Sequence, residues 1–350
     1  MNKFLKEIYE QPGAIERTLN FYSSSKGREI LNRIKQKVDS EHFEQILFTG
    51  MGSSYFTSHA ASNLFNSLGI ASYEINSSEL LHYNLCLFNK KTLLISFSQS
   101  GESFEAKELL KILPSNVFCI GITNEAESTL AKMSDIVLPT FAGKEEMTST
   151  KTYIVTTLAA FIAGWNLSGC WSGEKIKKIS LLSENFKSAL TEYESRMNEI
   201  LAFLGDIQTI QIIARGPSFS TASQTALMFK EATRIAATST LGGEFRHGPM
   251  EMVTEGFRSV LFAPEGKTYS QSTKMAEDIT EFGGKVLLIT NKEYSVTNER
   301  IMQLVINEPD EFLFSMQSII PMQLFIDSYA KSKGFEAGSF SRGSKVTTIE

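Results

Sequence analysis

The sequence predicts an α/β protein made of two tandem copies of one parallel-sheet domain. Three observations lead to this prediction. Short apolar runs alternate with helical patterns, which is typical of a parallel sheet covered by helices on both faces. Turn residues of the first half recur in the second half at nearly constant spacing. Finally, 350 residues are enough to form two separate cores.

The composition is that of an ordinary soluble globular protein, with 42% hydrophobic and 21% charged residues. A net charge of −5 without basic runs argues against a nucleic-acid partner. Cys86, Cys119 and Cys170 are far apart and show no C-x-x-C spacing, which fits a reducing compartment. The N-terminus lacks the apolar core of a signal peptide, and no window is long enough to span a membrane. We therefore expect a cytoplasmic protein without a membrane partner.

The first half begins with a helical segment in which Pro12 separates two helices. Apolar and β-branched runs then predict five strands, at residues 45–49, 71–75, 92–97, 117–123 and 136–138. Helices are expected between the strands. A loop over residues 142–150 leads into a long apolar helix over residues 151–167. These elements make up one complete domain.

The pattern then starts again. Gly52 recurs as Gly216 at an offset of 164, and Gly101 as Gly266 at an offset of 165. An Ile-Thr-Asn triplet at the end of a strand recurs at an offset of 167. Chance rarely produces such a register, so we interpret the chain as a duplication. The predicted parts are an N-terminal helical segment 1–40, a first domain 41–170, a helical connector 171–204, a second domain 205–334 and a C-terminal tail 335–350.

A serine-rich loop between a strand and a helix is the first candidate site. It reads Ser98-Gln99-Ser100-Gly101-Glu102-Ser103. Backbone N–H groups and the positive end of the following helix favour an anion there, and the hydroxyls add further donors. The loop contains no lysine or arginine, which suits a phosphate monoester better than a polyphosphate. The second copy carries Pro264 and Glu265 at this place, so only the first domain is expected to hold a phosphate.

Three further residues in the second half are candidates for chemistry. Glu231 lies in a predicted helix, His247 in a turn before Gly-Pro, and Lys345 in a tail whose β-branched end suggests docking. On spacing alone, a solvated carboxylate, a structural histidine and a loose lysine explain them as well. His, Cys, Asp and Glu do not gather at metal-ligand spacing, and the Gly50-x-Gly52 turn lacks the third glycine of a dinucleotide fingerprint. No metal or cofactor is expected.

Six motifs carry a family resemblance. In order, they are Gly52-Ser53-Ser54-Tyr55, the loop Ser98 to Ser103, Glu146-x-x-Ser149-Thr150-Lys151, Lys230-Glu231, Glu244-x-x-His247-Gly248-Pro249 and Lys345-Val346-Thr347. Together they resemble the double sugar isomerase (SIS) domain family, specifically the isomerase half of glucosamine-6-phosphate synthase, from about residue 30 onward. The resemblance implies two three-layer α/β/α domains, each with a parallel flavodoxin-like sheet.

The resemblance also implies roles for individual residues. Glu231 matches the base that moves a proton between C1 and C2, and Lys345 matches the lysine that forms a Schiff base with the ketose. His247 matches the residue that opens the sugar ring and reaches the site from a neighbouring subunit, which implies a homodimer. The positions that match the phosphate cradle are Ser98, Gln99, Ser100 and Ser103, and those that match other substrate contacts are Ser53, Ser54 and Ser149.

Some positions depart from the family pattern. A second family lysine is replaced by Met228, and the usual Asp-x-Pro before the last lysine by Gly338-Ser339-Phe340. The chain starts Met1-Asn2-Lys3, without the glutaminase cysteine of the synthase. We therefore expect deamination of a sugar phosphate such as glucosamine 6-phosphate to a ketose phosphate and ammonia. A fructosamine-6-phosphate deglycase and a non-catalytic phosphosugar sensor are the alternatives.

Overall fold

The computed structural model describes residues 1–295, 298–339, 342 and 345–347, and these form two compact units. The first-sheet unit consists of residues 10–183 together with residues 342 and 345–347 near the C-terminus. The second-sheet unit consists of residues 1–9 and 184–339. Each unit contains one parallel sheet of five strands, which confirms the predicted α/β duplication.

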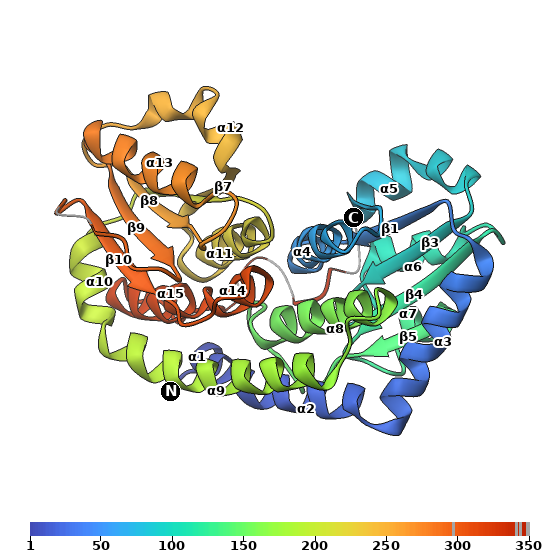
Figure 1. Cartoon of the computed structure of the whole chain (residues 1–350). Helices are drawn as coiled ribbons and strands as arrows, with labels where there is room; N and C mark the ends of the chain where they lie inside the picture. The colour runs from blue at the N-terminus through green and yellow to red at the C-terminus, as the bar shows by residue number, and fades with distance from the viewer. Residues whose placement is uncertain (296–297, 340–341, 343–344, 348–350) are drawn as a thin grey trace. The chain divides into compact units, whose positions relative to one another are not determined.

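The first-sheet unit has the strand order β2-β1-β3-β4-β5, with all neighbours parallel (Figure 1). Its central strands β1 and β3 are buried along their whole length, which explains their continuous apolar runs. The order is flavodoxin-like and places the topological switch point between β1 and β3. The strands are β1 (Gln45–Gly50), β2 (Ser72–Asn76), β3 (Thr92–Phe97), β4 (Val117–Thr123) and β5 (Ile136–Pro139).

Helices cover both faces of this sheet (Figure 1). α4 packs against α8, while α5, α6 and α7 form a second group. α8 is buried around almost its whole circumference, as expected for a helix that is apolar on all sides. The helices are α2 (Gln11–Ser23), α3 (Ser25–Glu41), α4 (Ser53–Ser67), α5 (Ser77–Tyr83), the short 3-10 helix η1 (Leu85–Asn89), α6 (Phe104–Lys111), α7 (Thr129–Met133) and α8 (Lys151–Leu167).

The second-sheet unit repeats this topology. Its strand order is β10-β9-β8-β6-β7. Read from the other end and counted from β6 as the first strand, this is the order 2-1-3-4-5 of the first sheet. The strands are β6 (Thr209–Ala214), β7 (Ala236–Leu241), β8 (Arg258–Phe262), β9 (Lys285–Thr290) and β10 (Ile301–Val305). The helices are α1 (Lys3–Tyr9), α10 (Met197–Leu204), α11 (Ser218–Thr233), α12 (Gly242–Arg246), η2 (Pro249–Met252), α13 (Tyr269–Glu281), α14 (Glu311–Gln317) and α15 (Ile320–Ser332). α9 (Gly173–Ser195) runs through the boundary between the units.

The N-terminal helix α1 belongs to the second-sheet unit, although α2 after it belongs to the first. Phe4 and Ile8 of α1 are fully buried, and α1 contacts α15. The amide of Asn2 donates a hydrogen bond of 2.6 Å to the buried carboxylate of Asp327. The first residues of the chain are therefore part of the core of the second repeat.

Among the residues described by the structure, no helix combines the length and the apolar character that a membrane span requires.

Candidate functional site

The candidate site lies at the carboxyl ends of β1 and β3, on either side of the switch point of the first sheet. Ligands of open α/β sheets bind at such points. β1 leads through Gly52, which has a φ of 51° and is the N-cap of α4. β3 leads through the serine loop (residues 98–103) into α6, with Ser103 as N-cap. Two helix N-termini therefore begin at the carboxyl edge of neighbouring strands.

The serine loop is held by hydrogen bonds within itself and to β4. The hydroxyls of Ser98 and Ser103 lie 3.3 Å apart and share a hydrogen bond. The N–H of Gly101 donates to the Ser98 hydroxyl at 3.1 Å. The carbonyl of Gln99 accepts from the N–H of Asn124 at 3.1 Å, and the Ser100 hydroxyl accepts from the N–H of Glu102 at 3.2 Å. The loop is thus a compact set of short hydroxyls and backbone donors, as anion binding requires.

Gly101 is the one position in this loop where glycine is required by geometry. Its φ is 64°, and a Cβ built there would lie 2.0 Å from the hydroxyl oxygen of Ser128. The next residue, Glu102, accepts from the N–H of Thr129 at 2.6 Å and from its hydroxyl at 3.0 Å. The Thr129 N–H is the main reason why the pKa of Glu102 is lowered. The loop is therefore pinned to the first turn of α7.

The other predicted serines lie in the same unit. Ser53 and Ser54 form the first turn of α4 and are partly buried. Ser149 lies in the loop before α8, where its hydroxyl is 2.6 Å from that of Thr152 and donates to Glu145 at 3.4 Å. All seven predicted substrate-contact residues therefore belong to the first-sheet unit.

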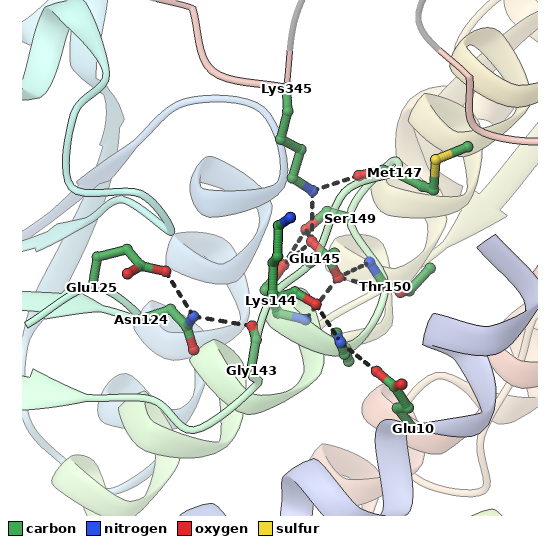
Figure 2. A network of polar contacts seen from close by, with 12 residues as sticks. Glu10, Asn124, Glu125, Gly143, Lys144, Glu145, Met147, Ser149, Thr150 and Lys345 are labelled. Atoms are coloured by element: carbon green, nitrogen blue, oxygen red, sulfur yellow. Dashed lines mark hydrogen bonds and ion pairs between the residues drawn. The ribbon is translucent and has the colours of Figure 1, made fainter. Parts of the chain in front are cut away.

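Glu145 is a site residue that the sequence analysis missed. Its side chain is fully buried, and its Oε2 accepts from the ammonium of Lys345 at 2.6 Å (Figure 2). The same ammonium donates to the carbonyl of Met147 at 2.6 Å. The quoted motif began one residue later, at the exposed Glu146, which pairs with Lys144 at 2.8 Å. Two adjacent glutamates look alike in sequence, and only the fold decides which one is buried.

The Glu145 carboxylate is surrounded by donors. Its Oε1 accepts from the N–H groups of Thr150 and Thr152 at 2.9 and 3.1 Å, and its Oε2 from the Thr152 hydroxyl at 2.5 Å. Burial by itself raises the pKa of this carboxyl group. The ammonium of Lys345 and these hydrogen bonds outweigh burial and leave the pKa lowered. Glu145 is therefore a carboxylate at neutral pH.

Asn124 links the serine loop to the loop that carries Glu145, and Figure 2 shows its contact with Gly143 of the second loop. Besides its N–H bond to Gln99, its amide nitrogen donates to the carbonyl of Gly143 at 3.1 Å. Its amide oxygen accepts from the N–H of Ala142 at 3.0 Å. The buried ammonium of Lys151 donates to the carbonyl of Lys144 at 2.7 Å. Polar contacts of Asn124 and Lys151 thus hold the two loops in position.

The remaining predicted residues belong to the second-sheet unit. Glu231 is partly buried in the last turn of α11, and Met228, three residues earlier, is fully buried. His247 is exposed at the C-terminal end of α12. α11 and α12 both pack against β7, so these two residues come from neighbouring elements. Of the departure at Gly338-Ser339-Phe340, the last residue lies outside the described residues.

The equivalent loop of the second-sheet unit has the acidic residue Glu265 instead of the serines. The N–H of Glu265 donates to the side chain of Asn291 at 2.6 Å. The carboxylate of Glu311 lies beside both glycine turns: Cβ atoms built on Gly216 and Gly266 would be 3.5 and 3.7 Å from its oxygens. Burial raises the pKa of Glu311. Glu311 follows Glu145 at an offset of 166, within the offsets of the repeat. This supports the expectation that only the first repeat binds a phosphate.

Within the described part of the chain, no group of three or more His, Cys, Asp or Glu side chains is placed to hold a metal ion.

Comparison with known proteins identifies two SIS domain matches in the chain, at residues 41–163 and 203–330. The chain is 29% identical over 357 residues to a glutamine–fructose-6-phosphate aminotransferase [isomerizing] of Pyrococcus horikoshii, covering 99% of this chain and 57% of that protein. The corresponding protein of Thermococcus kodakarensis is 27% identical over 360 residues, with 99% and 58% covered. The chain therefore spans somewhat more than half the length of these relatives.

Solved structures share the fold. The C-terminal domain of glucosamine-fructose-6-phosphate aminotransferase from Francisella tularensis superposes with a TM-score of 0.83 at 23% identity, covering 97% of this chain and 98% of that one. Glucosamine-6-phosphate deaminase from Thermotoga maritima superposes with a TM-score of 0.78 at 22% identity, covering 99% and 100%. At these identities the likeness concerns the fold.

Proposed function

The chain belongs to the SIS domain family, and from this premise we propose that it is a phosphosugar isomerase and deaminase. Its substrate would be an amino sugar 6-phosphate of the glucosamine-6-phosphate kind. Water would be the only co-reactant, and the products would be a ketose 6-phosphate and ammonia. The curated relatives are named as aminotransferases between glutamine and fructose 6-phosphate, so the proposed change in the sugar is the opposite one, with the nitrogen released as ammonia.

The observation that carries the proposal is the docking of Lys345 into the unit that contains the serine loop. An amine at the end of a chain is ordinarily loose. Here the ammonium is held by Glu145 and Met147, and Glu145 also accepts from Ser149, a predicted substrate contact. A fixed amine in the unit with the phosphate cradle supports covalent attachment to a sugar carbonyl.

The proposed steps balance in atoms and charge. Glu231 takes a proton from C2 of the open-chain amino sugar and returns it to C1, while a proton of the amino group passes to O1, which leaves an iminium at C2. The Lys345 ammonium passes one proton to the departing nitrogen as its amine adds to C2, so that ammonia leaves as ammonium and the iminium is now on the lysine nitrogen. Water then hydrolyses this iminium to the ketose carbonyl and the lysine ammonium. His247 would open the sugar ring, and the serine loop would hold the phosphate throughout.

Ammonia release from glucosamine 6-phosphate tests this proposal. Glu231→Gln removes the base, and we expect a loss of at least about 100-fold in rate. Glu251→Gln, an exposed carboxylate in the same unit, is the control and should be unaffected. An unchanged rate in Glu231→Gln would contradict the role of this base.

A substrate panel separates this reaction from the alternatives. Turnover of fructosamine 6-phosphates without turnover of glucosamine 6-phosphate would replace ammonia with an amino acid as the leaving amine. Calorimetric binding of sugar phosphates without any product would overturn the enzymatic proposal in favour of a phosphosugar-binding protein.

A further inference from the structure

The buried carboxylate of Glu145 needs a reason, because burying a charge is costly unless it is paired and hydrogen-bonded. Threonine donors satisfy Oε1, and the ammonium of Lys345 satisfies Oε2. This ammonium reaches Glu145 from 200 residues away in the sequence. The carboxylate and its hydrogen bonds thus form a fixed anionic socket on the first-sheet unit, and the tail supplies the cation.

The tail makes a second contact, close to the serine loop. The carbonyl of Thr347 accepts from the N–H of Phe104 at 3.2 Å. Phe104 is the first residue of α6, directly after Ser103. First-turn N–H groups of a helix have no partner within the helix, so the tail takes one of these donors. The ammonium and this carbonyl lie only two residues apart, and anchoring one therefore restricts the other.

We propose that Glu145 is the positioning residue for Lys345: its buried carboxylate holds the tail amine in the first-sheet unit and thereby also keeps Thr347 on the first turn of α6. The link to chemistry rests on the proposed function, whereas the tail contact does not. Glu145 acts through Lys345 and is not itself a catalytic residue.

The charge balance of the proposed reaction makes a permanent counter-ion useful. In the last step of that reaction, the protonated Schiff base of Lys345 and water give the ketone and the lysine ammonium, with the nitrogen–carbon bond broken and the carbonyl oxygen supplied by water. The positive charge is on the same nitrogen before and after the step. A carboxylate fixed by threonine donors can therefore stabilise both states without rearranging. Such preorganisation is the form in which a buried charge contributes most to catalysis.

Hydrogen exchange at the Phe104 amide tests the positioning role without any substrate. This amide donates to the Thr347 carbonyl, so its protection from exchange reports tail docking. Glu145→Gln keeps the shape but removes the charge, and we expect exchange at Phe104 to rise by about tenfold or more, since a charged hydrogen bond is worth about 1.5–3 kcal/mol. Glu146→Gln, the same change at the exposed neighbour, should leave it unchanged.

A double-mutant cycle guards against a general loss of folding in Glu145→Gln. Lys345→Gln should raise exchange at Phe104 in the same way, and the double variant should exchange no faster than either single variant, because both remove one contact. Wild-type protection in Glu145→Gln, or additive effects in the double variant, would overturn the positioning role.

Borohydride trapping links the contact to the chemistry. Fructose 6-phosphate reduced onto the protein should give a Lys345 adduct in wild type and in Glu146→Gln, and about tenfold less in Glu145→Gln. Sorbitol 6-phosphate has no carbonyl group. Its dissociation constants for wild type, Glu145→Gln and Glu146→Gln should therefore differ by less than about threefold. Glu145→Asp keeps the charge and should restore part of the trapping.

Equal trapping in Glu145→Gln and wild type would overturn the role of Glu145. An absence of any adduct on wild-type Lys345 would instead contradict the proposed function, while the exchange result at Phe104 would still decide the contact.

Discussion

At the scale of single residues, Gly101 shows most directly how sequence limits the site. Two features exclude a side chain at this residue. Its backbone is left-handed, and an added Cβ would overlap with Ser128. The conformation disfavours any other residue by about 1–2 kcal/mol. The overlap adds about 1–3 kcal/mol, because the neighbour must move.

We therefore predict that Gly101→Ala lowers the free energy of unfolding by about 2–5 kcal/mol and weakens sugar-phosphate binding at least about tenfold. Gly69→Ala is the matched control, since Gly69 has a similar φ of 78° but no atom within 4 Å of its added Cβ. It should cost only the backbone part, about 1–2 kcal/mol, and leave binding unchanged. Urea unfolding and calorimetry measure both quantities. Equal effects of the two substitutions would show that contact with Ser128 is unimportant.

Residue-level prediction from sequence succeeded where local chemistry is distinctive and failed where burial decides. The serine loop was placed correctly between a strand and a helix because its small hydroxyl residues end an apolar run, while its role in phosphate binding stays a prediction. The docking of Lys345 was anticipated from the β-branched residues after it. Glu145 was overlooked because nothing in the sequence separates it from Glu146. Its role depends on a contact with a residue 200 positions away, which no local pattern contains.

At the scale of elements, the two repeats differ in the loops that follow their third strands. The loop after β3 offers hydroxyls, whereas the loop after β8 carries Glu265 and has the carboxyl group of Glu311 beside its glycine turns. Acidic groups at this place disfavour a phosphate. One fold therefore carries a hydroxyl-lined loop in the first repeat and an acidic loop in the second.

This asymmetry predicts one sugar phosphate per chain. The double variant Ser98→Ala with Ser103→Ala should weaken binding by about 100-fold, since each hydrogen bond to a charged phosphate contributes about 1.5 kcal/mol or more. Thr268→Ala changes the equivalent position of the second repeat and should have no effect on affinity. Calorimetry gives both the stoichiometry and the affinity. Two sites per chain, or a loss caused by Thr268→Ala, would contradict the assignment.

The central strands were predicted from sequence more clearly than the edge strands. β1 and β3 are buried on both faces and read as unbroken apolar runs. β7 and β10 are edge strands with exposed positions, so their sequences lack such a run and were not assigned. The repeat still allowed the second sheet to be predicted. The constant offsets of the glycine turns indicated it even where the apolar pattern of single strands was weak.

At the scale of the whole molecule, each end of the chain belongs to the repeat that is farther away in sequence. α1 packs in the second-sheet unit against α15, and residues 345–347 pack in the first-sheet unit. The sequence predicted that the N-terminal segment is helical. It did not indicate which element would cover its buried face, because amphipathic spacing records burial and not the partner.

The groups proposed for catalysis are divided in the same way. Lys345 and the serine loop belong to one unit, while Glu231 and His247 belong to the other. The His247 side chain is exposed at the end of a short helix, which leaves it accessible to a second chain. We propose that the active species is a homodimer in which His247 of one subunit acts with Lys345 of the other.

Mixing two inactive variants tests this arrangement. His247→Asn and Lys345→Ala should each abolish turnover alone. In a mixed dimer, the site that combines the lysine of the first variant with the histidine of the second is intact, whereas the other site lacks both groups. Random exchange of subunits makes half of the dimers mixed, each with one active site of two, so about a quarter of wild-type activity should return. Ammonia release measured after mixing and subunit exchange, with the dimer verified by ultracentrifugation, gives the answer. If activity stays absent although mixed dimers form, His247 acts within its own chain.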